Sequence, residues 1–303
     1  MSDPAAIEVS QNGAPDSRSE PVWNREMILV NGSRTSLINV LDRGLQYGDG
    51  LFETIAVVNG KPLLWERHLQ RLTSGCHRLG ISVPDPILLA NEAAQICAGQ
   101  EKCVLKIIIT RGTGGRGYRA SQTSGHFTHL TPTRILSLHR WPDYPAAFSQ
   151  HGITLRLCKT RLGINPAIAG IKHLNRLEQV IARSEWDDPD IPEGLMVDSN
   201  GYVVEGTISN VFVVHKGVLT TPDLSGSGVD GVMRGLILDI AESFAIPNRI
   251  AQLRPDDIKK VDEIFLCNTL INIWPVRFFE GTSFDDFRIT RTIAAELQKY
   301  LAN

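Results

Sequence analysis

One lysine of this chain stands where it could act as a nucleophile. Lys172 lies in the stretch 168–180, at what the sequence indicates is a junction between a loop and a helix. A primary amine there can form a Schiff base with an aldehyde cofactor, provided that a desolvated or cationic environment lowers its pKa. Because lysines near helix starts are usually solvated, this interpretation depends on what the rest of the chain supplies.

Other segments carry groups that an aromatic aldehyde bearing a phosphate would need. Glu205 ends a predicted strand before a polar turn, where its carboxylate could hold the proton of a pyridine nitrogen. The turn 228–234 has glycines at 228 and 231 and leads into a predicted helix, whose first backbone N–H groups are free to bind phosphate. Arg71 could add positive charge. Taken alone, Glu205 could equally be an exposed glutamate at the end of a strand, and Arg71 could equally be an arginine on a helix surface.

A glycine-rich stretch, residues 111–118, contains a literal Gly-x-Gly-x-x-Gly. A dinucleotide site would require a helix to open at the last glycine, but residues 118–125 show no helical period of apolar residues, and no Lys-Ser/Thr pair indicates a P-loop. The stretch instead predicts a glycine loop that presents Arg116, whose guanidinium suits a carboxylate. Alone, such a loop could be a structural turn with a solvated arginine.

Several other kinds of site are not expected. His126 and His129 are three residues apart in a predicted loop without a third ligand, so no metal site is predicted, and no Gly-x-Ser-x-Gly elbow indicates a hydrolase. The net charge of −2 argues against nucleic-acid binding or a polybasic membrane contact. No apolar run approaches the roughly 18 uncharged residues of a membrane span. Five scattered cysteines indicate a reduced, cytoplasmic protein.

The order of the predicted strands and helices that position these residues indicates a two-domain α+β fold. Strands and helices are predicted on both sides of a proline-containing segment that indicates a linker. The predicted parts are a disordered tail at 1–22, a small N-terminal domain at 23–140, an interdomain linker at 141–149 and a large C-terminal domain at 150–303.

Local patterns predict the turns and the helix around the lysine. The pairs Asn31-Gly32, Asn59-Gly60 and Asn200-Gly201 predict tight hairpin turns. A helix is expected over about 172–187, with Leu174, Leu177 and Ile181 on one apolar face and Lys172 off that face.

The motifs together resemble a known family. Residues 42–54, 68–72, 204–212 and 231–234, with Lys172, are similar to the fold-type IV pyridoxal-phosphate enzymes, which include branched-chain and D-amino-acid aminotransferases and 4-amino-4-deoxychorismate lyase. The likeness runs from about Met27 to the C-terminus. Residues 111–118 and 161–180 resemble the lyase in particular.

The resemblance implies a D-amino-acid aminotransferase-like fold with a smaller N-terminal α/β domain and a larger C-terminal α/β domain that binds pyridoxal 5′-phosphate. It implies that Lys172 carries the Schiff base, that Glu205 faces the pyridine nitrogen and that Val229 packs against the ring. The residues that it assigns to the phosphate are Arg71, Thr269 and the backbone groups of Val232 and Met233.

The resemblance also assigns residues to the substrate. Thr54 occupies the position of a glycine in branched-chain aminotransferases, where the lyase uses a threonine hydroxyl, so Thr54 and Lys172 are the predicted catalytic residues. Glu53 departs from the threonine of the lyases but matches other members of the group. Arg116 and Tyr118 are expected to bind a substrate carboxylate, by their match to the carboxylate-binding loop of D-amino-acid aminotransferase.

The implied activity is conversion of 4-amino-4-deoxychorismate to 4-aminobenzoate and pyruvate, in folate biosynthesis. Lys172 would remove the ring C4 proton, and Thr54 would deliver the proton that turns enolpyruvate into pyruvate. The resemblance further implies a homodimer with the site near the subunit interface. The alternatives are an aminotransferase of D- or branched-chain amino acids on the same fold and a non-catalytic cofactor-binding module.

Overall fold

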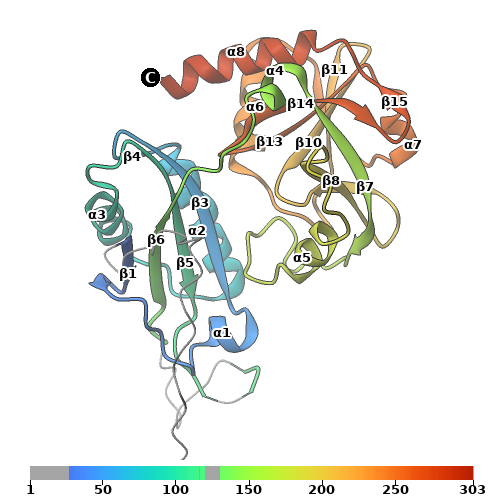
Figure 1. Cartoon of the computed structure of the whole chain (residues 1–303). Coiled ribbons are helices and arrows are strands. Elements are labelled where there is room, and N and C mark those ends of the chain that lie inside the picture. The colour runs from blue at the N-terminus through green and yellow to red at the C-terminus, as the bar shows by residue number, and fades with distance from the viewer. Residues whose placement is uncertain (1–26, 116, 120–129, 303) are drawn as a thin grey trace, which may run out of the picture.

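The computed structural model describes residues 27–115, 117–119 and 130–302, which form two sheets with their helices (Figure 1). The predicted tail at 1–22, Arg116, His126 and His129 therefore lie outside the described residues.

The first sheet is antiparallel throughout and has six strands. Its core forms where α2 (Trp65–Leu79) and α3 (Pro86–Cys97) bury apolar side chains against it. α3 begins as its sequence indicates, with Asp85 accepting hydrogen bonds from two N–H groups of the first turn and Pro86 at the first helical position. In order across the sheet, the strands are β2 (Ser33–Arg34), β1 (Ile28–Val30), β6 (Thr133–His139), β5 (Lys102–Thr110), β3 (Gly50–Val58) and β4 (Lys61–Pro62).

The second sheet is mixed and has nine strands. Parallel pairing joins β7 to both β14 and β8, and β11 to β12. In order across the sheet, the strands are β12 (Asn248–Ala251), β11 (Val218–Pro222), β10 (Asn210–His215), β13 (Glu263–Asn268), β14 (Asn272–Phe279), β7 (Ile153–Leu162), β8 (Glu193–Asp198) and β9 (Val203–Gly206), with β15 (Thr282–Ser283) paired to β14.

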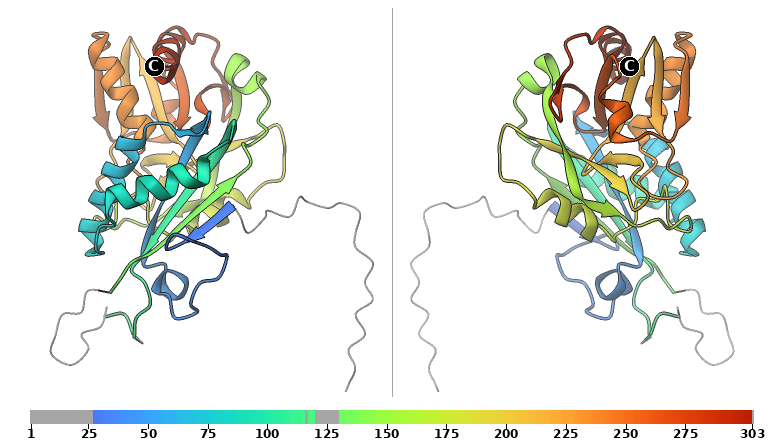
Figure 2. Two further views of the ribbon diagram at one scale, coloured as in Figure 1. Left: turned by 90° about the vertical axis from the view of Figure 1, so that its left-hand side faces the viewer. Right: turned by 90° about the vertical axis from the view of Figure 1, so that its right-hand side faces the viewer.

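Helices α6 (Val232–Ser243) and α8 (Arg288–Ala302) pack on this sheet around Phe212 and Phe265, whose stacked rings have centroids 5.1 Å apart. The remaining helices are α1 (Arg43–Tyr47), α4 (Ala147–His151), α5 (Leu177–Arg183) and α7 (Pro255–Ile258). In Figures 1 and 2, α1 lies at the far end of the first sheet, away from α8. The two-domain α+β fold is confirmed, whereas the domain boundaries stay a prediction. Among the described residues, no helix combines the length and apolar character that crossing a membrane requires.

The predicted hairpin turns are confirmed. Asn31 and Asn59 have positive φ angles of 51° and 50°, and each is followed by a glycine with positive φ, as a type I′ turn requires. Gly201, with φ 81°, closes the turn between β8 and β9.

The helix predicted over 172–187 is wrong in extent and in orientation. α5 covers only Leu177–Arg183, because the backbone before it pairs with another strand and cannot form helical i→i−4 bonds. The apolar face that was expected to pack into the core is largely exposed, with Leu177 69% and Ile181 51% accessible.

Candidate active site

The backbone around Lys172 pairs with the first sheet. The N–H of Phe52 donates to the carbonyl of Lys172 at 3.0 Å, and the N–H of Leu174 donates to the carbonyl of Gly50 at 3.0 Å. These bonds place residues 172–174 antiparallel alongside the start of β3 and fix the direction of the Lys172 side chain. They also explain why the helix starts late.

The same segment pairs with a loop of the second domain. The N–H of Gly170 donates to the carbonyl of Gly228 at 2.8 Å, and the N–H of Asp230 donates to the carbonyl of Gly170 at 3.0 Å. Gly170 has φ 77°, a backbone conformation that favours glycine. Lys172 therefore lies between β3 and the loop that leads into α6.

A cavity of about 620 Å³ opens at this junction. It brings together eight of the ten predicted site residues, which come from both domains and from six separate segments. Those that line it are Thr54, Arg71, Lys172, Glu205, Val229, Val232, Met233 and Thr269.

The environment of Lys172 favours the neutral amine. Its Nζ lies 4.5 Å from the centroid of the Phe52 ring. Burial and the positive charge of Arg71 lower the pKa of Lys172 from 10.5 to about 8, although Glu53 and Glu205 act in the opposite sense. A neutral amine is the form that attacks an aldehyde or removes a proton.

Glu205 ends β9 with a buried carboxyl group. Its Oε2 accepts a hydrogen bond from the N–H of Val229 at 2.8 Å, and Gln179 lies 3.4 Å from Oε1. Burial raises the pKa of Glu205, partly offset by the Val229 N–H and by the charges of Arg176 and Lys172. A protonated ring nitrogen placed here would supply the counter-charge that favours the carboxylate.

The start of α6 offers free hydrogen-bond donors. Gly231 is its extended N-cap residue and makes no side-chain cap, so the N–H groups of Val232 and Met233 have no helical partner. A Cβ at Gly231 would lie 1.9 Å from Oδ1 of Asn210, so only glycine allows this close approach. Arg71 lies beside the turn, with Nη1 donating to the carbonyl of Asp230 at 3.1 Å. This arrangement suits a phosphate.

Arg71 is held from behind by Glu53. The Arg71 guanidinium donates to both carboxylate oxygens of Glu53, and the distance from Nε to Oε1 is 2.9 Å. Nδ1 of His68 lies 2.7 Å from Oε2 of the same carboxylate. Burial alone would raise the pKa of Glu53, but the charge of Arg71 and the hydrogen bonds of His68 and Arg71 lower it to about 2. On β3, side chains alternate, so Thr54 faces the cavity whereas Glu53 faces α2. Glu53 therefore holds Arg71 in place and does not line the cavity.

Thr54 and Thr269 are in direct contact. The hydroxyl of Thr269 donates to the carbonyl of Thr54 at 2.9 Å, which ties the loop after β13 to β3. A phosphate contact from Thr269 would require this hydroxyl to turn.

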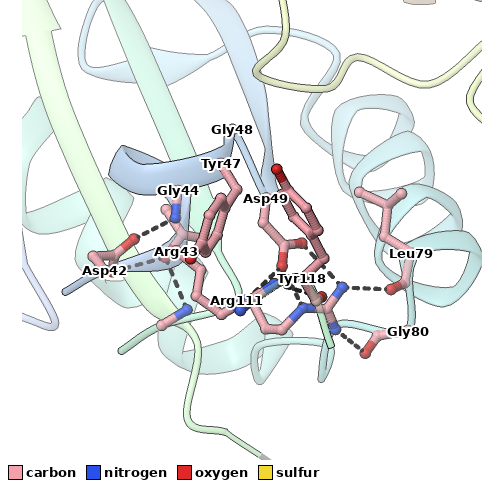
Figure 3. Close-up of polar contacts among 12 residues, drawn as sticks. Asp42, Arg43, Gly44, Tyr47, Gly48, Asp49, Leu79, Gly80, Arg111 and Tyr118 are labelled. Atoms are coloured by element: carbon pink, nitrogen blue, oxygen red, sulfur yellow. Dashed lines mark hydrogen bonds and ion pairs between the residues drawn. The ribbon is translucent and has the colours of Figure 1, made fainter. Parts of the chain in front are cut away.

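The glycine-rich stretch is anchored by a charged cluster at the end of the first sheet (Figure 3). The carboxylate of Asp49 accepts from Nε of Arg43 at 2.9 Å and from Nε of Arg111 at 2.7 Å. Arg43 also donates to the carbonyls of Gly117 and Tyr118, at 2.9 and 3.0 Å. The described residues of the stretch are therefore anchored to the end of the first sheet through Arg43.

Of the two predicted carboxylate-binding residues, only Tyr118 is described, and it is not among the residues that line the cavity. Arg116 lies outside the described residues, and Tyr118 is 89% exposed, with its ring edge-to-face against Tyr47 at 5.6 Å. Their role stays a prediction.

Sequence reasoning missed Arg176, which lines the cavity four residues after Lys172. On the helix that was expected there, it would have been one more surface arginine. Its position follows from the extended backbone that precedes α5, which no local sequence pattern indicates.

The donor set fits pyridoxal 5′-phosphate at three points. An amine with a lowered pKa, a buried carboxyl group and a helix start with an adjacent arginine match the aldehyde, the pyridine nitrogen and the phosphate.

Comparison with known proteins shows the family. The model of the class IV aminotransferase family matches residues 50–279, so the chain belongs to that family. Membership confirms the fold and pyridoxal 5′-phosphate as the cofactor.

Within the family, the chain is similar to lyases. It is 35% identical to an aminodeoxychorismate lyase of Vibrio harveyi, over 82% of this chain and 90% of that protein. The crystal structure of a 4-amino-4-deoxychorismate lyase from Pseudomonas aeruginosa is 44% identical with a TM-score of 0.86, covering 90% of this chain and 99% of that one. A D-alanine aminotransferase of Listeria monocytogenes is 23% identical over 90% of this chain and 94% of its own length.

Proposed function

We propose that this protein is a pyridoxal-phosphate-dependent lyase that converts 4-amino-4-deoxychorismate to 4-aminobenzoate and pyruvate, in folate biosynthesis. The observation that carries the proposal is the shared cavity of Lys172, Glu205 and Thr54, in a chain whose similar lyases cover nearly its whole length. The alternative, an aminotransferase, is supported by relatives of lower sequence identity, such as the D-alanine aminotransferase at 23%.

The residues divide the chemistry between them. When bound, the cofactor supplies an electron sink for deprotonation of a carbon that bears an amine. Lys172, whose pKa is about 8, is the base that takes the proton from ring C4 of the substrate. Glu205 holds the proton on the pyridine nitrogen, and Arg71 with the start of α6 holds the phosphate.

Thr54 is proposed to complete the elimination. Loss of the C4 proton and cleavage of the C3–O bond make the ring aromatic and release enolpyruvate. A proton delivered by the Thr54 hydroxyl to the methylene carbon then gives pyruvate. The hydroxyl is free to donate because the contact with Thr269 uses only the Thr54 carbonyl.

We also propose a cytoplasmic homodimer. Helix α5 exposes the aliphatic residues Leu177, Val180 and Ile181. Just before it, the Asn175 side chain donates to the carbonyl of Gly48, at the end of α1. Near α1, the exposed aliphatic residues are Leu37, Ile38, Val40, Leu41 and Leu45. Such a patch suits burial against a second copy, and Tyr118 could then reach the cavity of that copy. The cytoplasm is supported by five buried cysteines that are all free thiols.

The test compares the two enzyme classes directly. The protein is incubated with 4-amino-4-deoxychorismate and, separately, with D-alanine or leucine plus 2-oxoglutarate. The proposal expects 4-aminobenzoate as the main product and at most slow formation of glutamate. Fast glutamate formation without 4-aminobenzoate would replace the lyase by an aminotransferase, and no turnover on any of these amines would indicate a cofactor-binding module.

A further inference from the structure

Arg176 is a charged side chain of the cavity that has no role in the function proposed above. It is the residue directly before α5, and its Nε donates to the carbonyl of His173 at 3.0 Å. Its Nη2 lies 2.9 and 2.6 Å from the two ring nitrogens of His173. Among the described residues, no carboxylate lies within ion-pair distance of this guanidinium, and Nη1 makes no hydrogen bond.

The other two arginines of the cavity are committed to the protein. Arg71 is paired with Glu53. Arg183 donates to the carbonyl of Trp186 at 2.9 Å and lies 4.6 Å from the centroid of the Trp186 ring. Arg176 therefore differs from both.

His173 contacts the Arg176 guanidinium as a neutral imidazole. Burial and the charge of Arg176 lower the pKa of His173 to about 4, so the imidazole is uncharged at neutral pH and can accept from the guanidinium. Burial lowers the pKa of Arg176, and the charges of Glu205 and Glu178, which form no ion pair with it, offset this only in part. A partly buried guanidinium without a paired carboxylate is costly. It becomes favourable when an oxyanion occupies the adjoining space.

Pyridoxal 5′-phosphate would place an oxyanion at a defined point of this cavity. Three contacts would orient its ring: the aldehyde carbon at Lys172, the nitrogen at Glu205, and the phosphate arm at Arg71 and the start of α6. The aldehyde carbon and the phosphate arm are substituents of neighbouring ring atoms. The ring hydroxyl is on the other neighbour of the aldehyde-bearing atom, so it would lie on the edge away from the phosphate, between Lys172 and Glu205. The charge of Arg176 acts on both of these residues.

We propose that Arg176 binds the ring 3-oxygen of the cofactor as a phenolate, with His173 holding the guanidinium in place. Arg176 is thus a fourth contact to the cofactor. Its charge also acts on the nitrogen through which Lys172 holds the cofactor, and lowers the affinity of that nitrogen for a proton. The other charged groups that face Lys172 are Glu53 from β3, Arg71 from α2 and Glu205 from β9.

The inference rests on the cofactor site of the proposed function but not on the substrate, so its test uses no substrate. Cofactor-free protein is titrated with pyridoxal 5′-phosphate and with the analogue that lacks the 3-hydroxyl, and the dissociation constants are compared. The variants are Arg176→Met, Arg176→Lys and, as a matched control from the same wall of the cavity, Arg183→Met.

In the wild type, loss of the hydroxyl should weaken binding by about 10- to 100-fold, the range of a charge-assisted hydrogen bond. In Arg176→Met this ratio should fall by roughly tenfold, since the arginine partner of the oxygen is gone and only the hydrogen bond of the oxygen to the Lys172 nitrogen remains. Arg183→Met should keep the wild-type ratio, and Arg176→Lys should give an intermediate ratio.

A second readout is the pH titration of the visible absorbance of the bound cofactor. Its apparent pKa should rise by about one unit or more in Arg176→Met, because a nearby positive charge is removed, and should stay unchanged in Arg183→Met. The inference is overturned if Arg176→Met retains the wild-type ratio of dissociation constants. A wild-type ratio near one overturns it even if the methionine variant does not fold. A protein that passes this test but releases no 4-aminobenzoate would refute the proposed function alone.

Discussion

Replacing Glu53 by glutamine removes the charge that holds Arg71 while keeping the shape of the side chain. Glu53 is 1% exposed, and its pKa falls from 4.5 to about 2 in the folded protein. Each pKa unit corresponds to about 1.4 kcal/mol, so the carboxylate contributes about 3 kcal/mol to folding at neutral pH. Because the folded pKa is depressed, this contribution is present above about pH 4.5 and is lost as the pH falls toward 2.

Urea unfolding of the cofactor-free proteins measures the effect. Glu53→Gln should lower the free energy of unfolding by about 3 kcal/mol near pH 7 and by about half as much near pH 3. The control is Asp239→Asn, which removes the partner of Arg67 on the same helix α2. That pair is exposed, with side-chain accessibilities of 34% and 57%, and should contribute less than about 1 kcal/mol. If Glu53→Gln were as mild as the control, or if its effect were independent of pH, the buried pair would not support Arg71 as described.

Substitutions at three further residues test the cavity. Burial lowers the pKa of Lys172 from 10.5 to about 8, so its charge destabilises the cofactor-free protein below about pH 8. Lys172→Met should therefore raise the free energy of unfolding near pH 7, and the gain should vanish as the pH rises toward 10.5; a loss of stability at both ends would contradict this. Thr54→Val should slow 4-aminobenzoate release by about 100-fold or more while changing cofactor affinity little, and Thr54→Ser should restore part of the rate; an unchanged rate would remove Thr54 from the mechanism. Glu205→Gln should slow single-turnover release by about 100-fold with the cofactor still attached, because the pyridine nitrogen loses its proton; full activity would refute that role.

Much of the cofactor site could be predicted because its residues stand in local motifs. Glu205 lies near the end of a strand, and the glycines before Val232 mark a turn into a helix, so each can be recognised from neighbours in sequence. Their convergence on one cavity could be expected only from the resemblance, since Thr54, Lys172 and Thr269 are separated by more than ninety residues at each step.

What could not be predicted depends on contacts between distant segments. The helix around Lys172 starts late because residues 172–174 pair with β3, which no local propensity reveals, and this places Arg176 in the cavity. Similarly, Glu53 looked like a departure from the lyase pattern, but its side chain faces α2 and pairs with Arg71. The apolar residues of α5 predicted a helix face buried in the core, but Leu177 on that face is exposed in the single chain.

The most direct test of the central claim is the stoichiometry of products formed by the wild type and by Lys172→Ala. With 4-amino-4-deoxychorismate as substrate, the wild type should release 4-aminobenzoate and pyruvate in equal amounts. Lys172→Ala should release neither and should lack the visible absorbance of the attached cofactor. Equal product release by Lys172→Ala with that absorbance intact would contradict the account.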